Sequence, residues 1–451
     1  MEHKLVTPAK TVAPPGLKKL IEQCQNLYPD QKNPLQVTAL LKYWLGGQDP
    51  LDYISMYFNP GKAELNIPPH WHYITFGLSD LHGDGRVHQV DNSDETMEHL
   101  SGMGFELTFR LIKQTPSSEN EKPPTWPANL LQALARYVFQ TGNRFVIGDN
   151  VPWRKSLDSS TSNIQHMLIA NDPQLMRTKT PFGWVDFCQI VGVTEEELDQ
   201  ASRWNGKGVL NLLKKDPTTG GEWLITNMNR SQSVFALFPD TLQQLEKDLE
   251  NEGSDLAGVN ADFTFKEIPK TKIKTEFDSE MLAVKCTLND NVQPDRAIKS
   301  ETIDDAKFCS TPLSTSNSLN MSFPPSYQSN SLQVVHLDGL QLTLAPYAAK
   351  FLILAIRDRI RHGRHFTFKN QNMALTMVSE SVTGAVVSKK TPYGVLGYWM
   401  QVLIADDFID VMLESFKDLV GGIGAMTLPR EYNWPDRNLK IIIDNPEQQY
   451  D

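Results

Sequence analysis

Cysteine is scarce in this chain, and the scarcity excludes a disulfide scaffold. The 451 residues include four cysteines, Cys24, Cys188, Cys286 and Cys309, with no CxxC pair and no zinc-ligand spacing. We therefore expect free thiols in a reducing compartment. The N-terminus lacks the apolar core of a signal peptide, and no apolar run reaches the length of a membrane span. These absences predict a protein of the cytoplasm, the nucleus or both.

An excess of basic residues is also missing. The formal net charge is −11 at pH 7, and the isoelectric point is about 5.5. Nucleic-acid binding depends on clustered Lys and Arg that neutralise phosphates. We therefore expect no direct nucleic-acid partner, and no membrane partner either. An acidic surface of this kind suits a basic or polar peptide better.

No recognisable catalytic or nucleotide-binding motif is present. GxSxG and HExxH do not occur. The pair Gly102 and Gly104 leads into an expected strand, whereas a dinucleotide fingerprint opens a helix. Gly206-Lys207 lacks the first glycine of a P-loop, because Ala201 stands in its place. The sequence predicts no enzyme, with no catalytic residue, no bound metal and no cofactor.

One acidic loop leaves a competing hypothesis open. Asp80, His82, Asp84, Gly85 and Asp91 occupy positions of a calcium-loop spacing, with His and Asp at two places where an EF-hand has other ligands. The flanking segments resemble strands rather than helices, which favours a hairpin turn. The alternative is an enzyme with a non-standard metal site around Asp80, His82 and Asp84.

Two pairs of histidines could in principle bind zinc. His70 and His72 share one face of an expected strand, and His362 and His365 lie near an expected helix end. Neither pair comes with a cysteine or a second complete set of ligands. Structural histidines with satisfied hydrogen bonds are therefore the favoured interpretation.

Length and composition predict an α+β protein with two mixed globular domains joined by a flexible linker. Hydrophobic residues at 40% and aromatics at 9% suffice for real cores. A long Ser-rich segment without periodicity cannot bury enough apolar area to offset its ordering entropy. The expected parts are a disordered tail over 1–15, an N-terminal α+β domain over 16–265, a disordered regulatory insertion or linker over 266–331, and a C-terminal α+β domain over 332–451.

Hydrophobic periodicity predicts the individual elements. Helices are expected over 17–27, 34–45, 127–141, 194–204, 241–250, 346–360 and 407–419. Strands are expected over 70–78, 104–112, 164–170, 184–192, 223–226, 332–337, 340–344, 365–369, 373–379, 384–388, 399–404 and 439–443.

The segment from residue 130 to residue 149 is the most informative stretch. An aromatic-bearing helix runs into a loop with one carboxylate. Considered singly, Tyr137 and Phe145 are core aromatics, and Asp149 is a turn former. Their combination favours a protein that grips another protein.

Six blocks of sequence closely resemble the Suppressor of fused family: residues 27–53, 70–81, 104–110, 124–127, 135–140 and 362–367. The match extends from about residue 17 to 445, apart from much of 268–331. The resemblance implies a two-domain, non-enzymatic negative regulator of Hedgehog signalling. Such a protein binds Gli or Cubitus interruptus-type zinc-finger transcription factors through a short Ser-Tyr-Gly-His segment. It holds them in the cytoplasm and represses them in the nucleus, and a Fused-type kinase is a second candidate partner.

The resemblance also implies a set of peptide-binding residues in this chain. In the first domain, the family's contact positions fall on Tyr137, Phe145 and Asp149. Val259 and Ala261 follow near its end, and a further apolar contact falls near Phe351, where the family pattern has leucine. A histidine of the bound peptide that faces Asp149 would make a charge-assisted hydrogen bond. The linker would let the two domains close around the peptide, so we expect the free protein to be more open.

Overall fold

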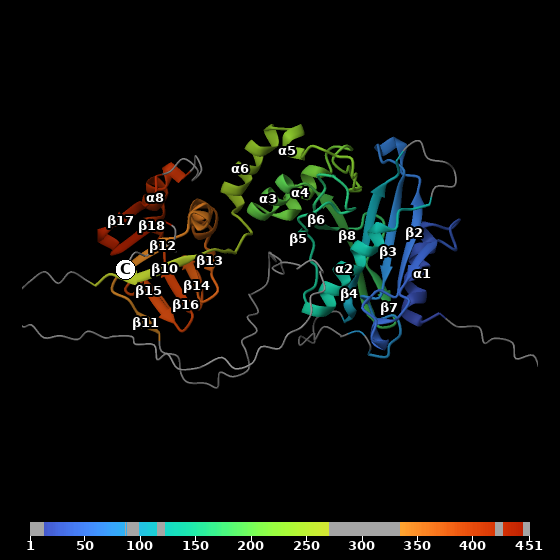
Figure 1. Ribbon diagram of the computed structural model, residues 1–451, viewed down its shortest axis with the longest axis horizontal. Helices are drawn as coiled ribbons and strands as arrows, with labels where there is room; N and C mark the ends of the chain where they lie inside the picture. Colours follow the sequence, from blue (N-terminus) through green and yellow to red (C-terminus); the bar gives the residue numbers. More distant parts are fainter. Residues whose placement is uncertain are drawn as a thin grey trace, which may run out of the picture.

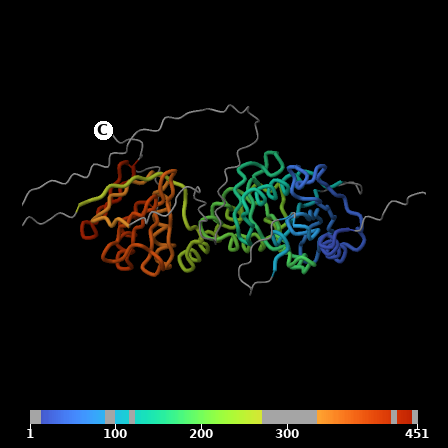
Figure 2. The backbone as a smooth tube through the Cα atoms, turned by 90° about the horizontal axis from the view of Figure 1, so that it is seen from below, coloured from blue at the N-terminus to red at the C-terminus, as the bar shows by residue number. Residues whose placement is uncertain are grey.

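The computed structural model describes residues 13–85, 87, 99–114, 122–269, 334–419 and 427–444. Two halves lie side by side along the long axis, the first drawn blue to green and the second orange to red (Figures 1 and 2). Most of the expected tail and of the expected insertion falls outside the described residues. In the described part, no helix has the length and apolar character that crossing a membrane requires. The α+β class is confirmed.

The first half is built on a mixed sheet in which β3 and β4 are central. Its order is β1-β2-β3-β4-β8-β6-β5, with β7 paired to β8. Neighbours run antiparallel except β4 and β8, which are parallel. The strands are β1 (Leu35–Thr38), β2 (Tyr53–Asn59), β3 (His70–Phe76), β4 (Leu100–Ile112), β5 (Asn150–Pro152), β6 (His166–Asn171), β7 (Thr178–Thr180) and β8 (Gly183–Val193).

Helices cover both faces of this sheet. α2 (Trp126–Thr141) packs its apolar side on the face that carries Phe105, Leu107 and Phe109 of β4. α1 (Pro15–Leu27) packs on the opposite face against Ile74 and Phe76 of β3. A third cluster joins the far edge of the sheet to α3 (Glu195–Arg203), α4 (Gly206–Leu213), α5 (Val234–Leu237) and α6 (Asp240–Glu252).

The second half holds two sheets around one apolar core. Their orders are β10-β12-β18-β17 and β11-β15-β16-β14-β13-β9. The strands are β9 (Gly258–Asn260), β10 (Phe263–Glu267), β11 (Val335–His336), β12 (Leu340–Leu344), β13 (His365–Lys369), β14 (Ala374–Val378), β15 (Tyr393–Leu396), β16 (Trp399–Leu403), β17 (Arg430–Trp434) and β18 (Leu439–Ile443). The helical segments are α7 (Pro346–Ala349), a π-helix (Leu354–Arg359) and α8 (Asp406–Ser415).

The strand pairing corrects the expected end of the first domain at residue 265. β9 pairs with β13 and β10 pairs with β12, so both strands belong to the second half. The chain crosses between the halves at residues 253–257, just after α6. The two strands are short, and nothing in their own composition shows which sheet they join.

Four expected elements differ in the structure. The helix over 34–45 is absent: its first residues form β1, and Leu40, Leu41 and Leu45 are exposed, so a helix here would have no core face to bury. Residues 223–226 and 384–388 form turns and isolated bridges, because each segment lacks a strand partner along its length. The single helix over 346–360 is divided into α7 and the π-helix.

Candidate partner-binding site and the buried polar cluster

Tyr137 and Phe145 are nearly buried and lie against each other. Their rings stack with centroids 5.8 Å apart, and Phe145 meets the ring of Phe105 at its edge. Only 8% of Tyr137 and 7% of Phe145 is exposed. Asn143 donates a 3.0 Å hydrogen bond to the Tyr137 hydroxyl. Both aromatics therefore belong to the core, with a thin rim at the surface.

Asp149 closes the turn that follows these aromatics. The Val146 N–H donates to Asp149 Oδ2 over 2.7 Å, and the Asp149 N–H donates to the Val146 carbonyl over 3.0 Å. Burial raises the pKa of the Asp149 carboxyl, while the Val146 N–H and the Lys207 charge oppose the rise. The turn role is confirmed, and one carboxylate oxygen, Oδ1, has no hydrogen bond among the described residues.

The Asp149 turn is fixed to α4 by two glycines. A side chain on Gly206 would place its Cβ 2.0 Å from the Gly148 carbonyl oxygen, so only glycine permits this approach. Gly148 itself has a φ of +99°. The contact holds the carboxylate beside Lys207 and immediately before β5, the last strand of the first sheet.

The remaining expected contacts lie in the second half. Val259 belongs to β9, the last strand of the six-stranded sheet, and is partly buried against the core. The Ala261 N–H donates to the Lys369 carbonyl over 2.9 Å. Phe351 is stacked on Phe366 with centroids 6.5 Å apart. The structure thus groups the six residues into two sets, one beside β5 and one in the core behind β9.

The acidic loop around Asp80 is built as a turn. Asp80 Oδ1 accepts from the backbone N–H groups of His82 and Gly83, at 3.0 and 2.7 Å. His82 Nε2 lies 3.5 Å from an oxygen of Asp52. In the described part of the chain, no three His, Cys, Asp or Glu side chains are grouped closely enough to hold a metal ion.

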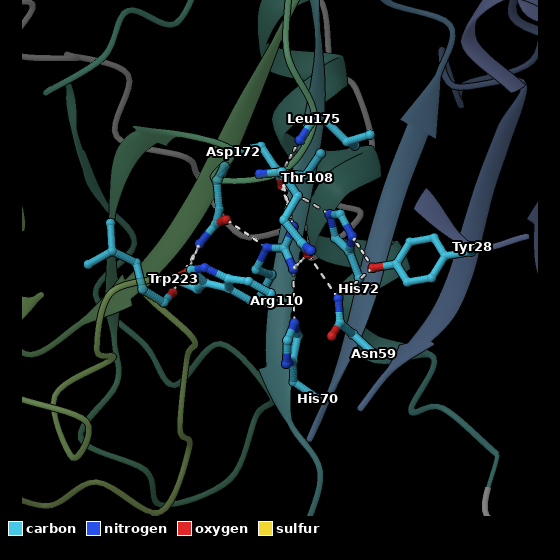
Figure 3. Close-up of polar contacts among 12 residues, drawn as sticks. Tyr28, Asn59, His70, His72, Thr108, Arg110, Asp172, Leu175 and Trp223 are labelled. Atoms are coloured by element: carbon cyan, nitrogen blue, oxygen red, sulfur yellow. Dashed lines mark hydrogen bonds and ion pairs between the residues drawn. The ribbon is translucent and has the colours of Figure 1, made fainter. Parts of the chain in front are cut away.

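A buried polar cluster occupies the sheet face opposite α2, with Arg110 at its centre (Figure 3). Arg110 is 0% exposed. Its Nη2 donates to both oxygens of Asp172, at 2.9 and 3.1 Å. Its Nε donates to Gln189 over 3.0 Å, and Nη1 donates to Gln174 and to His70 Nε2, each over 2.9 Å. The buried guanidinium is therefore surrounded by acceptors.

Asp172 is equally well satisfied. Besides Arg110, it accepts from Thr108 Oγ1 over 2.9 Å, from His72 Nε2 over 3.0 Å and from the Leu175 N–H over 2.8 Å. Burial alone would raise the pKa of this carboxyl, but Arg110 and His72 hold it well below its usual range. The pair is ionised and compensated inside the protein.

The hydrogen bonds set the state of both histidines. The Pro68 carbonyl lies 2.8 Å from His70 Nδ1 and can only accept, so the proton is on Nδ1 and Nε2 accepts from the arginine. In His72, Nε2 donates to the aspartate and Nδ1 accepts from the Tyr28 hydroxyl over 2.8 Å. Burial and the Arg110 charge lower the pKa of His70 to about 3 and that of His72 to about 4. The interpretation of this pair as structural is confirmed.

Glu106, on the same strand and face as Arg110, has no basic partner among the described residues. Its carboxylate accepts from Thr75 Oγ1, Ser79 Oγ and the N–H groups of Gly77 and Ser79, at 2.6 to 3.0 Å. Burial outweighs these bonds and raises the pKa of Glu106 to about 7. The residue ties the loop after β3 to the centre of the sheet.

Sequence patterns did not reveal this cluster. The alternation in β4 predicts a half-buried strand with Glu106, Thr108 and Arg110 toward solvent, whereas all three are 0% exposed. The one available signal was the pair of histidines on β3. Asp172, which completes the cluster, is 62 residues from Arg110 and carries no local mark.

A pocket of about 710 Å³ opens elsewhere, at the β1 side of the first sheet. Leu35, Met56, Phe58 and Trp71 line it. None of the six expected peptide contacts is among its lining residues, so it is separate from the candidate site.

The fold and its edges define a class: a two-part α+β protein with a buried polar core in one half and edge strands, β5 and β9, beside the candidate contacts. Residues 47–231 match the family model described as Suppressor of fused protein. Residues 243–443 match the model described as Suppressor of Fused Gli/Ci N terminal binding domain. The chain belongs to the Suppressor of fused family.

Individual relatives agree with this assignment. The proteins named Suppressor of fused homolog from Mus musculus and Homo sapiens are each 43% identical over 450 residues, covering 95% of this chain and 91% of the relative. The crystal structure of Drosophila Suppressor of Fused is 53% identical, with a TM-score of 0.79, and covers 96% of this chain and 98% of that chain. A structure described as the Sufu-Fu complex is 62% identical over 52% of this chain and 98% of that chain, with a TM-score of 0.49.

Proposed function

We propose that this protein is a negative regulator of Hedgehog signalling that binds a Gli or Cubitus interruptus-type transcription factor through a short Ser-Tyr-Gly-His segment. In this role it holds the factor in the cytoplasm and represses it in the nucleus, without an enzymatic step. Family membership supports the proposal, as does the match of residues 243–443 to a domain described as Gli/Ci-binding. A Fused-type kinase is a proposed second partner.

The placement of candidate contacts at two sheet edges carries the proposal. β5 ends the first sheet and follows Asp149 directly, and β9 ends the six-stranded sheet and contains Val259. Edge strands present backbone N–H and C=O groups on their outer side. An extended peptide can pair with such edges through its main chain, while nearby pockets select its side chains.

The Asp149 carboxylate provides a specific acceptor at the first edge. Oδ2 is occupied by Val146, which leaves Oδ1 for a histidine of the peptide. Asn150, the next residue, has a buried side-chain oxygen with no hydrogen-bond partner in the described part of the structure. A buried acceptor without a partner is costly, so polar groups of a ligand would be stabilised here.

Fluorescence anisotropy of a labelled Ser-Tyr-Gly-His peptide tests the proposal. We expect Asp149→Asn to weaken binding by about 2 to 5 kcal/mol, because the amide keeps an acceptor for the Val146 N–H but removes the charge. Asp149→Ala should weaken it at least as much. Asp216→Asn is the matched control, since Asp216 also closes a turn through its carboxylate, onto the Thr218 N–H.

Two outcomes decide the matter. Tight binding by the parent and the control, lost in Asp149→Asn, supports the site. If the parent protein does not bind the peptide, the chain has the family's fold but not this partner. For the cellular role, the nuclear fraction of a tagged Gli-type factor should fall when this protein is co-expressed, and should recover with Asp149→Asn.

A further inference from the structure

The crossing between the halves is a short, closely bonded segment. α6 packs Leu245 and Leu249 in the third cluster of the first half, and Leu256 already belongs to the core of the second half. Residues 253–257 therefore span the boundary, where the chain passes from yellow-green helix to the second half in Figure 1.

Ser254 bonds to both halves at once. It is 0% exposed. Its Oγ donates to the Arg203 carbonyl at the end of α3 over 2.7 Å, and its N–H donates to the Asp358 carbonyl of the π-helix over 2.8 Å. Its own carbonyl accepts from Arg359 Nη1 over 2.8 Å and from Arg364 Nη1 over 2.7 Å.

The buried Arg359 side chain donates hydrogen bonds to main-chain carbonyl groups rather than to a carboxylate. Besides Ser254, its Nε donates to the His365 carbonyl over 3.0 Å. It forms no ion pair with any described residue. Burial, with the nearby Arg364 charge, lowers the pKa of Arg359 to about 10, so it stays charged at neutral pH. A desolvated guanidinium is costly, and its fork of donors is here directed at the crossing segment.

Further contacts around the crossing segment also join the first half to the second. Arg357 lies 3.6 Å from Glu246 of α6, and His362 Nε2 donates to the Glu250 carbonyl over 3.0 Å. Gly253 has a φ of +79°, and a Cβ there would lie 2.7 Å from the Asp358 carbonyl oxygen. Asp358 lies at the end of the π-helix, where main-chain carbonyls need partners outside the helix, and its carbonyl accepts from Ser254.

The bonded segment connects the two edge strands by a short path. Asn150 of β5 donates to Ser202 of α3 over 3.1 Å, and the next residue, Arg203, accepts from Ser254. On the other side, the Thr367 N–H of β13 donates to the Ala257 carbonyl just before β9. We infer that Ser254, Arg359 and Arg364 form a positioning joint that sets the angle between the halves, and with it the placement of β5 relative to β9. Its effect on peptide binding rests on the proposed function.

Spin-label distance measurements test the joint directly. Labels on cysteines introduced at Lys215 and Tyr398, exposed positions in different halves, report the angle, with Cys286 and Cys309 replaced by serine. Arg359→Lys keeps the charge but removes the fork, and Ser254→Ala removes the hydroxyl that donates to the Arg203 carbonyl and accepts from the Leu256 N–H. We expect both to broaden the distance distribution relative to the parent protein. The control is Arg361→Lys, an arginine of the same segment whose ion pair with Asp410 is exposed.

An unchanged distribution in both variants would overturn the joint. Hydrogen exchange in β3 and β4 should stay at the parent level, which separates a change of angle from unfolding. If Arg359→Lys does not fold, Ser254→Ala carries the test.

A peptide titration forms the second part of the experiment. When fewer molecules hold the two edges at the binding angle, the apparent affinity falls by that fraction, and we expect a loss of about fivefold for Arg359→Lys. If a variant with a broadened distance distribution binds the peptide as tightly as the parent protein does, the angle between the halves does not affect binding. If the parent protein itself binds no peptide, the proposed function fails, while the distance measurement still decides on the joint.

Discussion

Two arginines taken out of water differ in what they bind. Arg110 meets the Asp172 carboxylate inside one half, and both side chains of this ion pair are 0% exposed. Among the described residues, Arg359 donates only to main-chain carbonyls, at the boundary between the halves. Removing one member of a buried ion pair strongly destabilises the protein, because the other charge stays buried without compensation. A guanidinium on carbonyls instead holds a segment in place, so we expect the first cluster to determine stability and the second to determine orientation.

Removal of Asp172 should have the largest effect on stability. Asp172→Ala leaves Arg110 buried and uncompensated, and we expect a loss of about 3 to 5 kcal/mol in the free energy of unfolding of the first half. Hydrogen exchange of the β3 and β4 amides in urea measures it. Asp186→Ala is the control, because Asp186 pairs with Arg177 at the surface, where an ion pair contributes little to stability. A loss below 1 kcal/mol would contradict the role of the cluster.

Acid should reveal the cluster through its histidines. His72 has a folded pKa of about 4 and His70 one of about 3, both below the usual 6.5. As the pH falls, these histidines therefore bind protons in the unfolded chain before they do so in the folded protein. Stability falls as the pH drops from about 6.5 toward 4. The slope is about 1 kcal/mol per pH unit for each histidine. His72→Gln should flatten the slope in pH-dependent urea unfolding, whereas His99→Gln, at an exposed histidine, should not.

Glu106 should act in the opposite direction. Its folded pKa of about 7 lies above the usual 4.5, so the folded protein binds the proton more tightly and stability falls as the pH rises from about 4.5 to 7. Glu106→Gln keeps one acceptor oxygen for the loop and removes the charge. The variant should gain stability relative to the parent as the pH rises through this window. Parallel curves for the two proteins across that range would contradict the assignment.

Alanine substitutions at two glycines should have the smallest effect. Gly253→Ala and Gly384→Ala both place alanine at nearly the same φ, +79° and +78°, but only the first brings Cβ against the Asp358 carbonyl. The positive φ strains alanine at both positions, and the ψ of 175° at Gly253 adds to that strain because this region is nearly confined to glycine. We expect only Gly253→Ala to change the distance between the halves. Equal behaviour of the two variants in the spin-label measurement would remove Gly253 from the joint.

Local sequence patterns correctly predicted the elements that are specified by their own residues. The apolar repeat from Leu130 to Val138, opened by Pro127 and closed by Gly142, is α2 in the structure. Residues 340–344 and 439–443 are strands with the predicted bounds. The pattern over 34–45 failed because helical spacing requires a surface to pack against, and Leu40 and Leu41 have none. The candidate residue Asp149 was predicted both as a turn former and as a peptide contact; the first is confirmed and the second stays a prediction.

The α+β class, most helices and strands, and the family could be predicted before folding was considered, because these depend on short-range periodicity and on long blocks of matching residues. Only the tertiary structure decided that the polar face of β4 is buried, that β9 and β10 belong to the second half, and that Ser254 bonds to both halves. The physical reason is range. A carboxylate such as Asp172 compensates Arg110 only once the fold brings together residues far apart in the chain, and no local pattern records that meeting.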